Sequence, residues 1–160
     1  HTGGLVEHSL NVYRNLRNIT ARGLGEQPVE GVYNLDRPVE ETVAVLALLH
    51  DVCKALCYHE ETKRRRNSDT GQWENYKAYT FQDPFPLGHG EKSLYIISRF
   101  MQLNAAEALA IRWHMGAYDD AVKGGSRAMN EAMTMTPLVW RLQEADMCAA
   151  WIDERGGENG

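Results

Sequence analysis

The sequence lacks the long apolar runs of membrane proteins, the paired cysteines of many secreted proteins and the net positive charge of proteins that bind along nucleic acids. No apolar run is long enough to cross a bilayer, which argues against a membrane partner. The three cysteines form no CxxC pair, and an odd number does not suit a disulfide framework, so we expect a reducing, cytoplasmic location. A formal net charge of -5 argues against binding along a nucleic-acid backbone and leaves room only for a local basic site.

Length and composition predict one soluble globular domain. A chain of 160 residues can build one sizeable core but not two, and 43% hydrophobic with 24% charged residues is close to the globular average. The sequence has no internal repeat and no low-complexity tract. We therefore expect a single domain over residues 1–155 and a frayed tail over 156–160. Because the sequence begins at His1 without an initiator methionine, we also expect a segment that precedes it.

Apolar residues at three-and-four spacing predict a mainly helical protein. Asn104 and Glu107 resemble a capping box, and Thr136 followed by Pro137 is typical of a helix start. Glycine and proline predict loops around residues 83–90 and 116–125. The expected helices cover residues 4–20, 39–53, 91–101, 105–114 and 137–152.

Residues 58–81 differ from the rest of the chain and predict a β-hairpin. Two polar and aromatic stretches, 58–66 and 73–81, are joined by a turn-forming segment. The first stretch ends in a basic run over residues 63–66, and aromatic residues lie across from it. Basic groups beside aromatics can bind a phosphate chain and stack a base, which makes Arg65 a candidate substrate contact. The alternative is a solvated, mobile hairpin tip.

One histidine–aspartate pair interrupts the apolar residues 43–53. A helix without a polar face is normally buried, and ionisable groups within it are costly unless something pairs with His50 and Asp51. A metal ion is the compensation that we expect.

Four further ionisable groups lie on faces that otherwise resemble core or at a loop-to-helix junction. Taken singly, such a histidine is more often a hydrogen-bonded core residue than a metal ligand. Together, however, neutral imidazoles and ionised carboxylates are the expected ligands of a divalent ion. The candidate metal ligands are His8, His50, Asp51, His89, His114 and Asp146.

The order of these residues resembles the HD superfamily of metal-dependent phosphohydrolases, over nearly the whole chain. A His-Asp dipeptide alone is weak support, whereas the ordered set is specific. The first and third segments are most similar to HD domains of bacterial 3′-to-5′ exoribonucleases and related bacterial or phage HD hydrolases. The segments that carry the resemblance are GLVEHS at 4–9, LLHDVCK at 48–54, GHGEKS at 88–93, WHMG at 113–116 and EAD at 144–146.

This resemblance implies an all-α fold, an HD-domain helical bundle with a small β-hairpin insertion around residues 58–81. It also implies two divalent ions, of Fe, Mn, Ni or Zn, that activate a hydroxide for in-line attack on phosphorus. In this arrangement Asp51 bridges the ions. The first ion is held by His8, His50, Asp51 and Asp146, and the second by Asp51, His89 and His114.

Three more residues near these ligands are candidate phosphate contacts. Lys54 shares a helix face with Asp51, and in the resembled family a lysine here often contacts phosphate. Lys92 and Ser93 follow His89 at a helix start, where backbone N–H groups favour anions.

Cys53 stands where many two-metal relatives carry glycine, a departure from the cyclic-dinucleotide phosphodiesterase branch.

Three functions agree with this pattern. The first is hydrolysis of a phosphoester of a nucleotide or a nucleic-acid end, with Asp51 and Lys54 as catalytic residues and a small phosphorylated molecule or a chain end as partner. The second is an HD-type di-iron oxygenase, which uses the same ligands. A nucleotide-binding regulatory HD domain ranks third, because a domain that has lost its chemistry would lack some of these ligands, and all six are present. The oligomeric state and the metal identity stay open.

Overall fold

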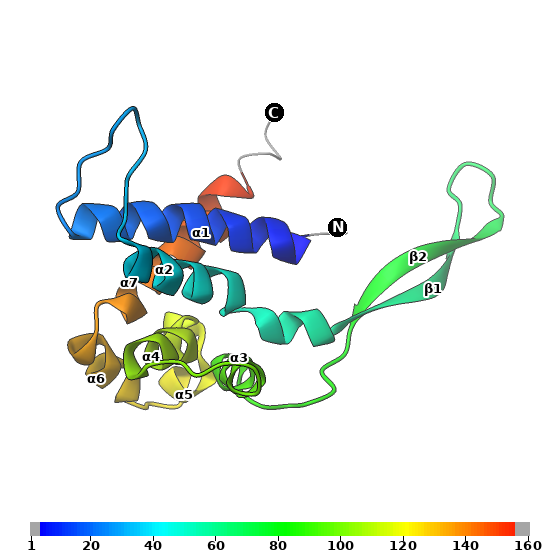
Figure 1. Ribbon diagram of the computed structural model, residues 1–160. Coiled ribbons are helices and arrows are strands. Elements are labelled where there is room, and N and C mark those ends of the chain that lie inside the picture. The colour runs from blue at the N-terminus through cyan, green and yellow to red at the C-terminus, as the bar shows by residue number, and fades with distance from the viewer. Residues whose placement is uncertain (1–3, 156–160) are drawn as a thin grey trace.

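The computed structural model describes residues 4–155, with the side chain of Leu56 left out. The chain forms a bundle of helices from which a two-stranded hairpin projects (Figure 1). The predicted tail, residues 156–160, lies outside the described residues. The elements are α1 (Gly4–Gly23), α2 (Arg37–Leu49), η1 (Val52–Leu56), β1 (Tyr58–Arg66), β2 (Trp73–Phe81), α3 (His89–Ser98), α4 (Ala105–Trp113), η2 (Gly116–Tyr118), α5 (Asp120–Lys123), α6 (Ala128–Met135), α7 (Leu138–Cys148) and η3 (Ala149–Asp153).

The core lies between α1, α2, α4 and α7. Helix α1 packs against α2 and α7, and α4 packs against α7, α3 and α2. Apolar residues at helical spacing meet there, which is the reason why the bundle forms. The predicted all-α bundle with a hairpin insertion is confirmed. The fully buried side chains of this core include Val12, Leu16, Val43, Leu46, Ile111 and Leu142.

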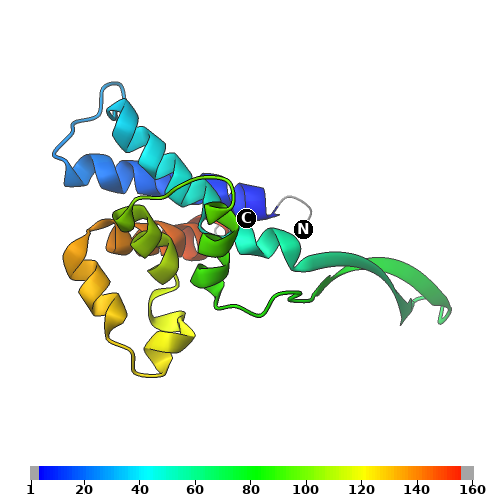
Figure 2. The ribbon, with the colours of Figure 1, turned by 60° about the horizontal axis from the view of Figure 1, so that its bottom comes forward.

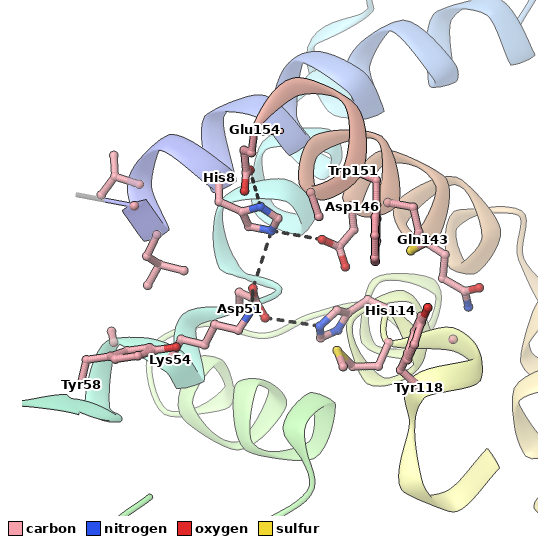
Figure 3. A pocket seen from close by; sticks show the side chains of 18 of the residues that line it. His8, Asp51, Lys54, Tyr58, His114, Tyr118, Gln143, Asp146, Trp151 and Glu154 are labelled. Carbon is pink, nitrogen blue, oxygen red and sulfur yellow. Dashed lines mark hydrogen bonds and ion pairs between the residues drawn. The ribbon is translucent and has the colours of Figure 1, made fainter. Parts of the chain in front are cut away.

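Helix α2 ends earlier than its apolar sequence predicts. The α-helix stops at Leu49, and Asp51 has φ -105° and ψ 15°, in the bridge region that many active-site residues occupy. The chain then continues as the 3₁₀ helix η1, in which the Lys54 amide donates to the Asp51 carbonyl at 2.9 Å. After this change of winding, Asp51 lies between His8 and His114, and Lys54 lies beside it on the wall of the same cavity (Figure 3).

The segment between α4 and α7 holds short helices where the sequence predicts a loop. Elements η2, α5 and α6 fill it, and Ala132 of α6 packs with Trp113 and Val139 in a second small core. Helix α6 was not predicted because only Ala132 of its eight residues is buried, which leaves little apolar periodicity to detect.

The hairpin leaves the helical body and extends into solvent (Figures 1 and 2). Strands β1 and β2 pair antiparallel along nine residues each, and every residue of β1 is exposed. A two-stranded sheet without a packed face is only marginally stable in water. The exposed side chains of β1 therefore add little to the stability of the hairpin.

Within residues 4–155, no helix is both long and apolar enough to cross a membrane.

Candidate metal centre

All six predicted metal ligands lie in one cluster, to which five segments of the chain contribute. Figure 3 shows four of them, His8, Asp51, His114 and Asp146. His8 belongs to α1 and Asp146 to α7, while His89 is the first residue of α3. The other three directly follow a helix, His50 and Asp51 after α2 and His114 after α4. The donor atoms form three groups, each within 4.8 Å: His8, His50 and Asp146; His50, Asp51 and His114; Asp51, Cys53 and His89.

Asp51 lies at the centre of the cluster, with its side chain only 3% exposed. Its Oδ1 atom lies 2.6 Å from Nε2 of His89 and 3.5 Å from Nε2 of His114. Its Oδ2 atom lies 3.7 Å from Nε2 of His8 and 3.6 Å from Nε2 of His50. The two carboxylate oxygens therefore face two different pairs of imidazoles.

Two of the imidazoles are held in a single tautomer by their Nδ1 atoms. Nδ1 of His50 lies 2.9 Å from the carbonyl of Ala47, and Nδ1 of His114 lies 2.7 Å from that of Ile111. A carbonyl oxygen can only accept, so each Nδ1 carries a proton, and the Nε2 atom of each ring faces the cluster, where it can bind a metal ion.

The Nε2 atoms of His8, His50 and His114 are buried without a hydrogen-bond partner. His8 Nε2 lies 3.1 Å from Oδ1 of Asp146, but without the alignment of a hydrogen bond. Buried polar atoms are rarely left unpaired, because each costs about 1–3 kcal/mol. Converging imidazole nitrogens beside two carboxylates are the donor set that a divalent transition-metal ion prefers. The residues thus fit the implied metal.

The charges of this centre are coupled. The carboxylate of Asp146 raises the pKa of His8 to about 9, against the opposing effect of burial and with a further contribution from Glu154. Burial has the larger effect on His50 and lowers its pKa to about 4, so this ring is neutral at pH 7. A metal ion binds the neutral ring, and it must therefore displace a proton from His8 below about pH 9.

Asp51 stays ionised although it is buried. Burial raises its pKa, but the neighbouring imidazoles of His114 and His89 outweigh that effect and hold the pKa well below its usual range. For His89, burial lowers the pKa, and the hydrogen bond to Asp51 outweighs it and raises the pKa to about 9. In the metal-free protein, therefore, the cationic imidazole of His89 is a direct partner of this carboxylate.

Glu154 contacts the ring nitrogen of His8 that does not face the cluster, a role that its sequence position did not indicate. Its Oε1 atom lies 2.7 Å from Nδ1 of His8, so the carboxylate fixes that ring as backbone carbonyls fix His50 and His114. Glu154 follows the π-helical turn η3, and its amide donates to the Ala149 carbonyl at 3.1 Å. The extra residue of a π turn brings Glu154 onto the side of the helix that faces His8.

We expect the Glu154→Gln variant to bind divalent metal about 10–100-fold more weakly, because loss of an outer carboxylate partner has effects of this size. Competition with a coloured chelator measures the affinity. Asp153→Asn is the matched control, since Asp153 accepts from Asn15 at 2.7 Å and is directed away from His8. Equal affinities in the two variants would remove Glu154 from the metal site.

A cavity of about 970 Å³ opens onto the cluster. His8, Asp51, His114 and Asp146 form part of its wall, and Lys54 lies beside Asp51 (Figure 3). Most of the remaining wall is apolar or aromatic. Its larger side chains are Leu5, Tyr58, Tyr79, Met115, Tyr118, Met147 and Trp151.

Of the four predicted substrate contacts, the structure brings only Lys54 to the cluster. Its ammonium nitrogen lies 2.5 Å from Oδ2 of Asp51, and the side chain as a whole is about one-third exposed. Lys92 is buried and forms an ion pair with Asp83. Ser93 accepts from the Cys53 amide at 3.4 Å.

Neither Lys92 nor Ser93 lines the cavity described above. Arg65 lies on the hairpin, 2.6 Å from the carboxylate of Glu74. The side chain of Lys54 is thus the one predicted phosphate contact that a molecule in the cavity can reach directly.

Cys53 has surroundings that its sequence position alone did not indicate. It is buried, as expected for a core residue, and its Sγ atom also lies 3.6 Å from Nδ1 of His89. Together with Asp51 and His89 it forms the third donor group of the cluster. A thiol here adds a soft donor beside the histidines.

The fold and the site together define a mainly helical protein whose histidines and aspartates are positioned to bind divalent metal. The HD domain family model matches residues 5–151, and the chain belongs to this family. HD domains bind divalent metals and are commonly metal-dependent hydrolases. Neither the curated proteins nor the solved structures gave a match. The similarity to exoribonuclease HD domains stays a prediction.

Proposed function

We propose that the protein is a metal-dependent phosphohydrolase that acts on a phosphoester of a nucleotide or of a nucleic-acid end. The observation that carries this proposal is the position of Asp51, whose two oxygens face two separate pairs of imidazoles. A carboxylate with an ion on each oxygen is the arrangement of a two-metal centre. The wide cavity beside it can admit a substrate.

In this proposal His8, His50 and Asp146 would hold one ion, His89 and His114 would hold the other, and Asp51 would be a ligand of both. Two divalent ions of Fe, Mn, Ni or Zn would supply an activated water and Lewis-acid stabilisation of the phosphate charge. The protein keeps the ligand rings in place through the carbonyls of Ala47 and Ile111 and through Glu154.

Lys54 provides the positive charge that orients the substrate. Burial lowers its pKa, but the carboxylate of Asp51 outweighs burial and raises that pKa, so the ammonium group is charged at neutral pH. Lys54 lies on the cavity wall, where its ammonium group can transfer its hydrogen bonds from Asp51 to a phosphate oxygen.

The cavity also supports a substrate that is larger than inorganic phosphate. Tyr58, Tyr118 and Trp151 lie on its wall, and each presents an aromatic surface to solvent. Aromatic rings of this kind stack with nucleobases, because every base has a π-face. A phosphoester that carries a base can therefore contact Lys54 and an aromatic side chain of the wall at the same time.

Metal analysis combined with an activity screen tests this proposal. We expect protein purified without chelator to contain at least about one divalent ion per chain and to hydrolyse phosphoesters when manganese is added. A chelator should abolish turnover, and added metal should restore it. Protein without metal and without turnover would refute the proposal. A mixed-valence iron signal with oxygen consumption would instead identify a di-iron oxygenase.

A further inference from the structure

One face of the hairpin combines cations with aromatic rings. Partners in an antiparallel pair project to the same side, and side chains alternate between the two sides along each strand. The register pairs Glu60 with Tyr79, Thr62 with Lys77, Arg64 with Asn75 and Arg66 with Trp73. We define the hairpin face as Arg64, Arg66, Trp73, Lys77 and Tyr79, which all lie on one side.

The hairpin face continues the wall of the cavity. Tyr79 and Tyr58, at the base of the hairpin, both line the cavity, and Lys54 lies between Tyr58 and Asp51 (Figure 3). From Tyr79 to Trp73 the strand advances six residues, or about 20 Å. A chain that lies along this face can therefore reach the metal centre with its end.

The two guanidinium groups of this face have no carboxylate partner within the described residues. The ion pairs of the hairpin instead join Lys63 to Glu61, Arg65 to Glu74 and Lys77 to Glu60. The guanidinium of Arg64 lies 5.9 Å from the centre of the Trp73 ring, and Nε of Arg66 donates to the Gly71 carbonyl at 2.9 Å. Both positive charges are available to an anion.

Lys77 adds a third cation that an anion can recruit. It forms an ion pair with Glu60 on the same face, and both side chains of this pair are exposed. An exposed pair of this kind contributes little stability, so a phosphate can replace the carboxylate at small cost. The net charge of the protein is -5, which makes this basic surface distinct from the body.

We propose that the hairpin face binds single-stranded nucleic acid and directs its end into the cavity. This inference rests on the proposed function, because it names the substrate as a chain end. Cations that alternate with exposed rings can bind the phosphates of a single strand while its unstacked bases stack on the rings. The bases of a duplex are already stacked on one another and cannot stack on these rings. In this inference Arg64 and Arg66 contact the substrate in place of Arg65, which lies on the opposite face of the hairpin with Glu74.

Fluorescence anisotropy of a labelled single-stranded oligonucleotide of about twelve nucleotides tests this inference. With chelator present, the metal centre does not contribute to binding. We expect Arg64→Gln/Arg66→Gln to weaken binding about tenfold and to reduce the slope of log K against log salt by about 1.4, or about 0.7 for each phosphate that is no longer neutralised. Trp73→Ala should weaken binding by about tenfold, because one base no longer stacks on the protein.

The matched control is Lys63→Gln/Arg65→Gln. It removes the same charge at the same spacing, but from the opposite face of the strand. We expect it to retain the wild-type slope and affinity within about twofold, and circular dichroism checks that each variant is folded.

Three outcomes would overturn the inference. They are an absence of binding by the wild-type protein at low salt, an equal decrease in affinity in the two double variants, and equal affinity for a duplex of the same sequence. If sedimentation shows a self-associated protein that the hairpin variants dissociate, while the oligonucleotide does not bind, the occupant of this face is a second copy of the chain.

These results are separable from the proposed function. A protein that binds the oligonucleotide but hydrolyses no phosphoester would retain the hairpin site without being the proposed enzyme. A protein that hydrolyses small phosphoesters without binding the oligonucleotide would be the proposed enzyme without the hairpin site.

Discussion

The Asp51→Ala variant is expected to lose most of its bound metal and at least about a hundredfold of its phosphoester turnover. Removal of an outer partner of a metal ligand already has effects of about 10–100-fold, and Asp51 contributes both of its oxygens directly. In the metal-free protein the same change deprives His89 and Lys54 of their shared carboxylate. Both partners are partly exposed, so the loss of this carboxylate costs about 1–3 kcal/mol, and the variant should also unfold at a lower temperature.

Asp119→Asn separates the loss of metal from the loss of stability. Asp119 is also a buried carboxylate, and its Oδ2 atom accepts from Arg112 at 2.7 Å, away from the six candidate ligands. We expect this control to lower the melting temperature while it retains the metal. Metal analysis, steady-state kinetics and thermal unfolding of both variants provide the comparison. Near-normal turnover in Asp51→Ala would contradict the two-metal proposal.

The Gly90→Ala variant is expected to be severely destabilised, by about 3 kcal/mol or more. A Cβ atom at this position would overlap the carbonyl group of Arg112 and lie 2.9 Å from the carbonyl oxygen of Ile111. Backbone atoms of α4 cannot move aside as the end of a flexible side chain can. Because Ile111 also holds the ring of His114, and His89 precedes the glycine, the separation of α3 from α4 should weaken metal binding as well.

Chemical denaturation measures the free energy of unfolding, and a chelator competition measures the metal affinity. Gly124→Ala is the control, because its Cβ would lie no closer than 3.2 Å to a neighbouring atom and its φ of -75° suits any residue. We expect less than about 1 kcal/mol of destabilisation there. If Gly90→Ala were as stable as this control, the close packing of α3 on α4 would not be required.

Much of the fold and of the metal cluster could be predicted because the relevant signals are local. The capping box at Asn104 and Glu107 forms as predicted, with both of its hydrogen bonds. The turn after Arg66 joins two strands that pair along their whole length. His8 and Asp146 each interrupt an apolar helical stripe, so their faces were recognisable from periodicity.

The features that could not be predicted depend on contacts between distant segments or on changes in helical winding. Glu154 is eight residues beyond Asp146, which places it about 80° away on a regular α-helix, and only the π turn η3 returns it to the side of His8. The burial of Lys92 depends on Asp83 in the preceding loop. Which face of the hairpin each arginine occupies follows from the strand register, which the basic run alone does not specify.

The pairing of His8 with Glu154 has a consequence for the order of assembly. The two residues are separated by 146 positions, and they belong to the first and last helical segments of the described chain. During synthesis, the ligand set is therefore complete only after Asp146 has left the ribosome, and His8 gains its outer carboxylate partner only after Glu154 has followed, when α1 can pack against α7. Metal capture should follow translation, and a bound ion would then slow the separation of these two helices.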